Sequence, residues 1–348
     1  MPQFSLKDAI VPEIFAPYVQ NLSTKTNRFI TSGITTSNFD ISAQLTQSGT
    51  EIQMPFINDL EGDPQIWNDT TNIAVDSTTT GKQRAFKFWL AKAFGYTDFS
   101  ETVSGAPIQE TIAQRFGAYW TRTDQRILLA TLKGIFANAD IATAKMFDDS
   151  ANAFSAKGFL ATISRLGDLQ DQTFNSIAVH SATYAMMKAQ QMIDTVQPAN
   201  AVTPFGTYNG MNIIVDDDLP IENGVATSYI FGSGSVGYAV AAPANAPAIE
   251  VDRNARENGG QTAIINRRVL ATHVMGTTIA DSFATTAGTV GIEALEKGAT
   301  WDYVVDPRNI RVVAYRAKLD DAFVTATQKG STDKNKKGAS TPSKKVGD

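Results

Sequence analysis

The chain has 348 residues, a formal net charge of -5, 43% hydrophobic residues, 19% charged residues and no cysteine. A chain-wide acidic balance argues against a primary nucleic-acid binder, which would carry a basic face, and the missing cysteine excludes disulfides, cysteine–zinc sites and thiol nucleophiles. With only His180 and His273 available, a multi-histidine metal centre is nearly impossible.

The length predicts two subdomains. In the N-terminal region, Pro12 and Pro17 interrupt any helix, and the Ser, Thr and Asn content favours an extended arm. The first thirty residues show no signal-peptide pattern, and no apolar run approaches the roughly 20 residues that cross a bilayer. We therefore expect a protein made in the cytoplasm, without membrane contact.

Residues 47–82 predict a long two-stranded excursion. Ile52, Met54 and Phe56 alternate with polar or proline positions, and a second alternating run includes Ile73 and Val75. Between Glu51 and Gly81 the chain contains no Lys or Arg but six acids, namely Glu51, Asp59, Glu61, Asp63, Asp69 and Asp76. Because two strands without a third are marginal in water, this excursion needs a partner surface.

The strongest helix signal covers residues 107–137. Pro107 suits the first turn, and apolar residues recur at steps of three and four as far as Ala137. At about 100° per residue, four basic side chains fall within an arc of about 40° beside the apolar face. These four, here named the basic stripe, are Arg115, Arg122, Arg126 and Lys133. The stripe is equally consistent with a solvated face and with a contact surface.

The second half reads as an α+β unit. We expect a helix over 155–166 capped by Ser155, a strand over 174–180, and a helix capped by Ser181 that runs to about Val196. Asn209-Gly210 predicts a hairpin turn before a strand over 211–215. Further expected elements are two strands within 226–242, a strand pair within 261–280, a short helix over 293–297 and a final strand over 310–315.

The composition changes at about residue 326. Residues 326–348 contain six lysines, two aspartates and no aromatic residue. Such a composition buries too little apolar area to offset the entropy of ordering, so we expect a disordered basic tail. It suits a solubilising end, a contact to phosphate backbone or a remnant of cloning.

Candidate chemistry is sparse. Gly232 to Gly237 match GxGxxG, but the proline-bound segment that follows cannot supply the helix that a dinucleotide site requires. Three adjacent carboxylates, Asp216 to Asp218, cannot converge on a cation from a strand, so we expect a solvated strand end. His180 and His273 lack triad partners at local spacing, and we expect structural roles for both. We predict no catalysis, no cofactor and no metal.

The order of elements resembles the major capsid proteins of tailed double-stranded-DNA bacteriophages, which have the Hong Kong 97 type fold. Its most specific phrase is the stretch from Tyr208-Asn209-Gly210 through the strand to Asp216-Asp217 and Leu219-Pro220. The segment 174–196 is similar to the entry of the family's A-domain, and the closing strands, from Trp301 to Val313, resemble those of its P-domain.

The resemblance implies an α+β capsid fold with named parts. Residues 1–46 would be the N-terminal arm and 47–85 the extended hairpin called the E-loop. The P-domain would comprise 86–169, with its spine helix at 107–137, and the return strands at 290–325. Residues 170–289 would be the A-domain, and 326–348 the tail.

The implied function is structural. Copies would form pentamers and hexamers that tile an icosahedral shell around double-stranded DNA in the virion. Implied partners are the chain itself, a separate scaffolding protein, a portal, possible decoration proteins and weakly contacted DNA. Two alternatives stay open: an encapsulin-like nanocompartment shell, and a soluble α+β enzyme.

A charge hypothesis connects the excursion and the helix. We expect the acidic hairpin of one subunit, through Asp59, Glu61, Asp63 and Asp69, to lie near the basic stripe of its neighbour. Opposite charges across an interface steer register more than they add affinity.

Overall fold

The computed structural model describes residues 29, 32, 34–36, 39–60, 62–70, 72–105, 107–169, 174–196, 205–283, 290–320 and 322–323. The chain divides into two compact units, one of Met1–Ala144 with Gly232–Arg311 and one of Lys145–Phe231 with Val312–Asp348. These divisions do not coincide with the expected domain boundaries, which remain a prediction. The expected basic tail lies outside the described residues.

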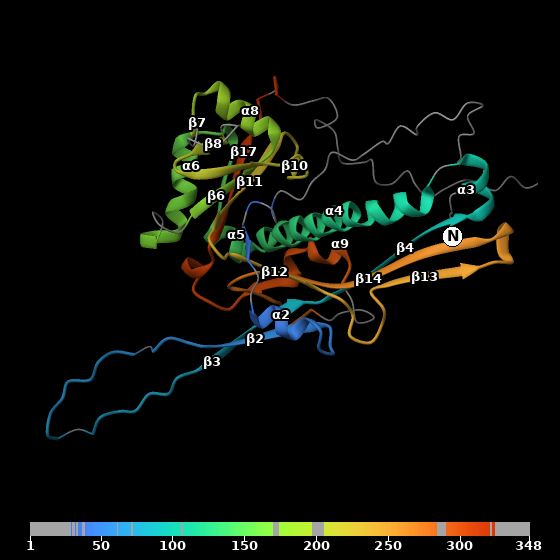
Figure 1. The fold of residues 1–348 in the computed structure, drawn as a ribbon. Helices are drawn as coiled ribbons and strands as arrows, with labels where there is room; N and C mark the ends of the chain where they lie inside the picture. Colours follow the sequence, from blue (N-terminus) through green and yellow to red (C-terminus); the bar gives the residue numbers. More distant parts are fainter. Residues whose placement is uncertain are drawn as a thin grey trace, which may run out of the picture. The chain divides into compact units, whose positions relative to one another are not determined.

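The first unit is built on one long strand, β14 (Gln261–Val274). Along one side it pairs antiparallel with β4 (Phe88–Thr97), and along the other with β13 (Ile249–Asn254) and β12 (Val236–Ala241) (Figure 1). The short strand β1 (Thr35–Thr36) adds to β12 in parallel. The two strands expected within 261–280 are present as β14 and the short β15 (Thr277–Ile279), but they belong to different sheets and do not pair with each other in the described chain.

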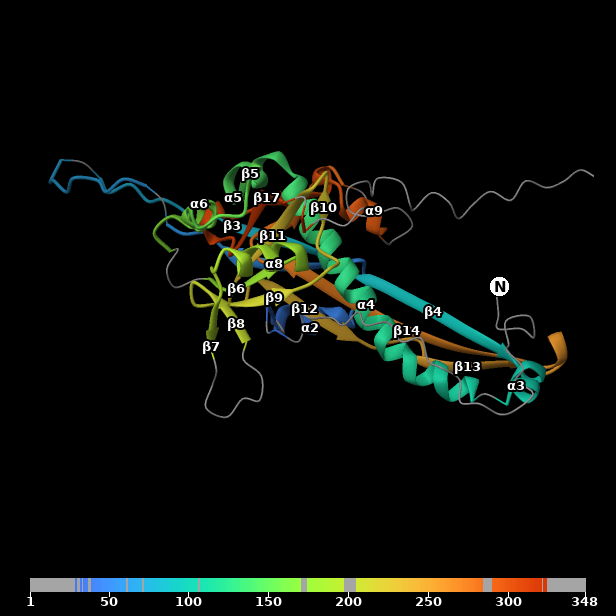
Figure 2. The ribbon, with the colours of Figure 1, turned by 90° about the horizontal axis from the view of Figure 1, so that it is seen from above.

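Helix α4 (Ile108–Ala137) runs alongside β4 and β14, as both ribbon views show (Figures 1 and 2). On this face of the sheet, Phe116 and Trp120 of the helix pack with Ile264 of β14. The opposite face is covered by α2 (Phe39–Leu45) and β2 (Glu51–Ile57), which enclose a second apolar cluster with β14. The sheet thus has a core on each side.

The C-terminal end of α4 is tightly held. The helix ends at Ala137, and the Asn138 side chain donates to the carbonyl of Trp301 at 2.7 Å while it accepts from the backbone of Asp140 at 2.9 Å. Helix α5 (Ala139–Lys145) follows at a bend of 91°. Elsewhere in this unit lie α3 (Asp98–Ser104), α9 (Ile292–Leu295) and β16 (Trp301–Tyr303), which pairs with β15.

The helix expected over 107–137 is confirmed as the 30-residue α4, with Pro107 at its N-cap position instead of in its first turn. Within the described ranges, no single helix is long and apolar enough to cross a membrane, and only the bent pair of α4 and α5 passes such a test by length and composition.

The expected hairpin is present, but its second strand lies later than predicted. Strand β2 pairs with β3 (Thr80–Phe86), with Ile52 opposite Ala85 and Ile57 opposite Thr80. Residues 72–79 contain no strand. The prediction around Ile73 failed because the alternation there buries nothing, whereas Ala85 joins the apolar cluster at the hairpin's base.

The second unit is a sheet with helices and its own aromatic core. Its strand order is β5-β17-β11-β6-β9-β8-β7, with β10 beside β11. The strands are β5 (Met146–Ala153), β6 (Phe174–Val179), β7 (Asp194–Val196), β8 (Phe205–Tyr208), β9 (Met211–Val215), β10 (Ile221–Glu222), β11 (Val225–Gly232) and β17 (Val312–Lys318). Helices α6 (Ala156–Ile163) and α8 (Ser181–Ala189) complete it.

Local signals in this unit were mostly right. The Ser155 hydroxyl caps α6 by accepting from the Gly158 backbone at 3.1 Å. Asn209 and Gly210 form the expected turn with φ values of 49° and 75°. Helix α8, however, is capped by His180 rather than Ser181, and it ends at Ala189 because β7 takes up the chain at 194–196.

Candidate functional site

The glycine-rich segment from Gly232 to Gly237 is a turn, as expected. The amide of Ser235 donates to the carbonyl of Gly232 at 3.3 Å, and Gly234 takes a φ of 67° that favours glycine. Strand β12 follows directly, so no helix begins there to hold a pyrophosphate.

The polar candidates of the second unit have structural roles. The His180 ring accepts from the Ala182 backbone through Nδ1 at 3.1 Å, and its Nε2 lies 3.7 Å from Asp217. Burial lowers the pKa of His180, against the opposing effect of Asp217. The expected solvated strand end is wrong for Asp216, which is buried and accepts from the backbone of Asp218 at 2.8 Å.

His273 of the first unit is fully buried on β14. Its Nε2 lies 3.2 Å from the Gln83 side-chain oxygen, which also accepts from the Gly276 backbone at 3.1 Å. Burial lowers the pKa of His273 to about 4, so the ring is neutral at physiological pH and serves the structure. Among the described residues, no three His, Asp or Glu side chains gather as a metal site requires.

Surfaces for association are the remaining candidates, and the hairpin is the first. Its base is anchored firmly. Arg84 on β3 donates to the Ile279 carbonyl at 2.7 Å and pairs with Asp281 at 2.9 Å. The buried Lys87 ammonium donates to the Gln47 carbonyl at 2.8 Å, and its burial lowers its pKa. These contacts fix the direction in which the hairpin leaves the sheet.

The outer part of the hairpin is exposed and unusually apolar. Six large apolar side chains are each at least 70% exposed, namely Ile57, Leu60, Ile66, Trp67, Ile73 and Val75. We name them the apolar tip. Asp59, Asp63 and Asp69 are exposed beside them, whereas Glu61 lies outside the described residues. Soluble monomers rarely expose contiguous apolar patches of this kind, which mark interaction sites.

Exposed apolar side chains gather on the first unit. Among the large apolar residues that the structure describes as exposed, Leu160 alone belongs to the second unit. Those outside the hairpin include Trp89 and Phe94 of β4 and Ile249 and Val251 of β13. The first unit therefore carries most of the exposed large apolar side chains among the described residues.

The basic stripe lies on α4, as predicted. Arg115 and Arg126 are exposed, whereas Arg122 and Lys133 are half-buried. Lys133 pairs with Glu296 at 3.5 Å, but Arg115, Arg122 and Arg126 form no ion pair with another described residue. Nor does any ion pair join stripe and hairpin within the described part of one chain. The three arginines are thus available to a second molecule.

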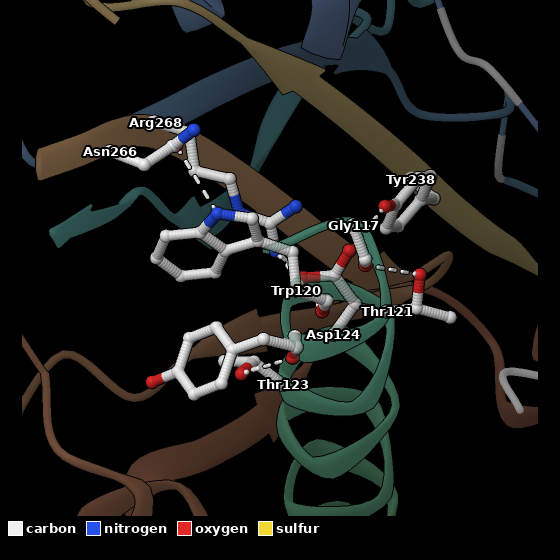
Figure 3. A network of polar contacts seen from close by, with 9 residues as sticks. Gly117, Trp120, Thr121, Thr123, Asp124, Tyr238, Asn266 and Arg268 are labelled. Carbon is white, nitrogen blue, oxygen red and sulfur yellow. Dashed lines mark hydrogen bonds and ion pairs between the residues drawn. The ribbon is translucent and has the colours of Figure 1, made fainter. Parts of the chain in front are cut away.

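A buried polar cluster holds α4 on the sheet (Figure 3). Asp124 pairs with Arg268 of β14 and accepts a hydrogen bond from the Tyr238 hydroxyl at 2.7 Å. The Arg268 guanidinium lies over the Trp120 ring, 4.4 Å from its centroid, and the Trp120 indole donates to Asn266 at 3.2 Å. No pattern in the sequence predicted this cluster.

The missed features left different signals in the sequence. Asp124 is an acid on the apolar side of a helix whose basic residues lie opposite, which could have marked it as a buried partner. Of the apolar tip, Ile73 and Val75 were assigned to a strand because they alternate with polar residues. Their exposure is a three-dimensional property, and alternation alone does not reveal it.

Comparison with known proteins places these surfaces in context. No family model matches the chain. The major capsid protein of Bacillus phage SPP1 is 35% identical over 329 residues, which cover 92% of this chain and 99% of that protein.

Solved structures that match this fold include phage capsids. The head structure of Helicobacter pylori bacteriophage KHP40 matches with a TM-score of 0.55 and 10% identity, over 89% of this chain and 95% of that one. The capsid of Ralstonia phage GP4 matches with a TM-score of 0.53 and 10% identity, over 89% and 96% of the two chains. At these identities the likeness shows the fold, and it confirms the expected α+β capsid architecture.

Proposed function

The chain belongs to the family of bacteriophage major capsid proteins, and from this membership we propose that its copies assemble as pentamers and hexamers into an icosahedral shell around double-stranded DNA. The observation that carries the proposal is the 35% identity to the SPP1 major capsid protein over 92% of the chain. The location that follows is the capsid of the virion.

The apolar tip supports assembly on physical grounds. Fully burying a large apolar side chain contributes about 1.5–3 kcal/mol, and six such residues stand at least 70% exposed on one hairpin. A neighbouring subunit would cover them. Because the base of the hairpin is anchored by Arg84 and Lys87, the tip is presented in a defined direction, which reduces the ordering cost of binding.

Charge would then set the register of neighbouring subunits. The hairpin's exposed acids, Asp59, Asp63 and Asp69, complement the unpaired arginines Arg115, Arg122 and Arg126 on α4. We place Glu61 and Lys133 in the same contact as its outer members. Close charge pairs of this type steer encounter and disfavour wrong partners.

The test reverses charge on α4. Arg122→Glu with Arg126→Glu should leave the subunit folded, because neither arginine forms an ion pair within the described chain, and should reduce shell formation at least tenfold. Assembly is measured by sedimentation and electron microscopy, and folding by circular dichroism. A matched control is Arg256→Glu with Lys297→Glu, which changes the same charge at exposed positions elsewhere on the first unit.

A compensating charge reversal on the hairpin provides the decisive experiment. Adding Asp63→Arg and Asp69→Arg to the reversed helix should recover shells if the two surfaces meet. Normal shells from the Arg122→Glu, Arg126→Glu variant alone would refute the charge contact, and the capsid assignment would then stand on the sequence relationship.

The finer parts of the proposal concern domains and partners. We propose that 1–46 is the N-terminal arm, 47–85 the E-loop, 86–169 and 290–325 the P-domain, and 170–289 the A-domain. We further propose a separate scaffolding protein, a portal, decoration proteins and weak contact with packaged DNA as partners. Particles purified from cells that express the chain with and without its genomic neighbours would test these partners.

The viral role is favoured over both alternatives. The SPP1 relative is a capsid protein, which favours a viral shell over an encapsulin-like compartment. The chain's matches are structural proteins, and we propose that it catalyses no reaction. Particle size separates the enzyme alternative, since an enzyme would elute as a small oligomer and a shell protein as megadalton particles.

A further inference from the structure

Asp124 occupies the side of α4 opposite to the basic stripe. At about 100° per residue, Arg115 and Lys133 are each nine positions away and lie about 180° from Asp124 around the helix axis. Arg122 and Arg126, each two positions away, lie about 160° from it. The buried acid and the exposed arginines therefore mark opposite edges of one continuous helix.

The contacts of Asp124 are directional. Its carboxylate meets Arg268 on β14 with one oxygen and the Tyr238 hydroxyl on β12 with the other, at 2.7 Å. The Asp124 side chain is 3% exposed and that of Arg268 12%. Burial lowers the pKa of Arg268 to about 10, against the opposing effect of Tyr119, so the guanidinium stays charged at neutral pH. The neighbouring strands β12 and β14 thus each contact a different oxygen of the Asp124 carboxylate.

Apolar packing alone constrains a helix less strictly. Phe116, Trp120 and Ile264 form an apolar cluster, and dispersion and the hydrophobic effect are not directional. A rotation of α4 by one residue would separate Asp124 from both partners and leave a buried guanidinium unpaired, which is costly. Buried ionic groups can in this way specify one arrangement among several of similar packing.

We propose that Asp124 and Arg268 are positioning residues, which fix the rotation of α4 on the sheet and thereby the direction in which Arg115, Arg122 and Arg126 point. The ion pair affects assembly by orienting the basic stripe, and the proposal requires no contact between the ion pair and a neighbouring subunit. This inference rests on the proposed contact between the stripe and a neighbouring hairpin, although its structural half can be tested in the unassembled subunit.

The test uses the absence of cysteine in the chain. A single cysteine at Thr131, about 20° from Asp124 and fully buried, reports the sheet side of α4. A single cysteine at Ala118, which is exposed, reports the other side. Each is placed in the full chain, with and without Asp124→Leu and Arg268→Met, which replace the buried pair by apolar side chains and so leave the subunit folded.

Maleimide labelling rates give the readout. With the ion pair intact, Cys at 131 should react at least 100-fold more slowly than Cys at 118. With the pair replaced, this protection should fall at least tenfold while the urea midpoint of unfolding stays near its parent value. The control is Ile127→Val, which loosens the same helix without touching the pair and should change protection only in proportion to stability. Unchanged protection in the apolar double variant would overturn the proposal.

Assembly separates this inference from the proposed function. If the stripe guides assembly, the apolar double variant should form malformed or fewer shells, at least threefold below the Ile127→Val control. If charge reversal of Arg122 and Arg126 leaves shells normal but the protection at 131 is lost without the ion pair, the stripe contact fails and the positioning role of Asp124 and Arg268 stands.

Discussion

Gly134→Ala should destabilise the protein, although alanine is the better helix former. Gly134 lies in α4 where the chain of α9 passes over it. A Cβ atom there would overlap the carbonyl oxygen of Leu295 and stand 2.6 Å from the Trp301 indole nitrogen. That indole donates to the same carbonyl at 2.8 Å, so the added methyl group would push into a buried hydrogen bond.

The magnitudes decide the sign. Alanine in place of glycine in a helix interior contributes about 1 kcal/mol of stability. Overpacking costs about 1–3 kcal/mol, and a buried donor left without its acceptor costs about 1–3 kcal/mol more. The net loss is roughly 1–5 kcal/mol, a large part of a typical total of about 5–15 kcal/mol.

Urea unfolding of unassembled subunits, followed by tryptophan fluorescence, would measure the change. The matched control is Gly117→Ala in the same helix, where an added Cβ meets nothing within 4 Å; this variant should gain about 0.5–1 kcal/mol. If the two variants shift the urea midpoint in the same direction, the argument from close packing at Leu295 is refuted.

Three further predictions concern buried polar groups and a helix cap. The pKa of His273 is lowered to about 4 in the folded state, so the unfolded chain takes up a proton first as pH falls below about 6.5, and the free energy of unfolding should decline by about 3 kcal/mol by pH 4. In urea unfolding measured over this pH range, His273→Gln should flatten the decline. A slope that stays steep in the variant would contradict the prediction. Gln83→Leu removes the acceptor for the Gly276 amide and the His273 ring and should cost about 1–3 kcal/mol, whereas Gln53→Leu, at an exposed position of β2 in the same hairpin, should change little. Ser155→Ala removes the cap of α6 and should cost about 1 kcal/mol, with Ser155→Asp close to wild type; equal losses from both would contradict the capping role.

Local rules predicted what local chemistry determines. The cap at Ser155, the turn at Asn209-Gly210 and the start of α4 after Pro107 each depend on a few adjacent residues, and all three were right. The cap of α8 was assigned one residue late, to Ser181. A histidine with an unprotonated Nδ1 accepts a hydrogen bond from a backbone amide as a serine hydroxyl does. The N-cap preferences used for the prediction do not include histidine.

Those local rules did not predict the pairing of strands that lie far apart in the sequence. A strand pair was expected within 261–280, whereas the structure has one 14-residue strand, β14, followed by the short β15. Asn266 to Arg268 continue β14 because they pair with Leu90 to Lys92 of β4, and their side chains bond to Trp120 and Asp124 of α4. Strands β4 and β13 escaped notice for the same reason, since their partner lies far away in the chain.

The two ends of the hairpin explain why a chain with an adequate core still exposes so much apolar surface. At the base, Ile52 and Met54 are buried, and their partner strand is fixed by Arg84. Beyond Ile57 the alternation stops, and Leu60, Ile66 and Trp67 are exposed. Asn58 and Gln65 bridge the loop there; the Asn58 amide donates to the Thr79 carbonyl at 2.9 Å, and the Gln65 side chain bonds to the Asn72 carbonyl at 3.1 Å and the Ala74 amide at 2.9 Å. Because the base is already ordered, a neighbour that covers the tip need order only the outer loop, so most of the free energy from burying Trp67 and its companions remains for association.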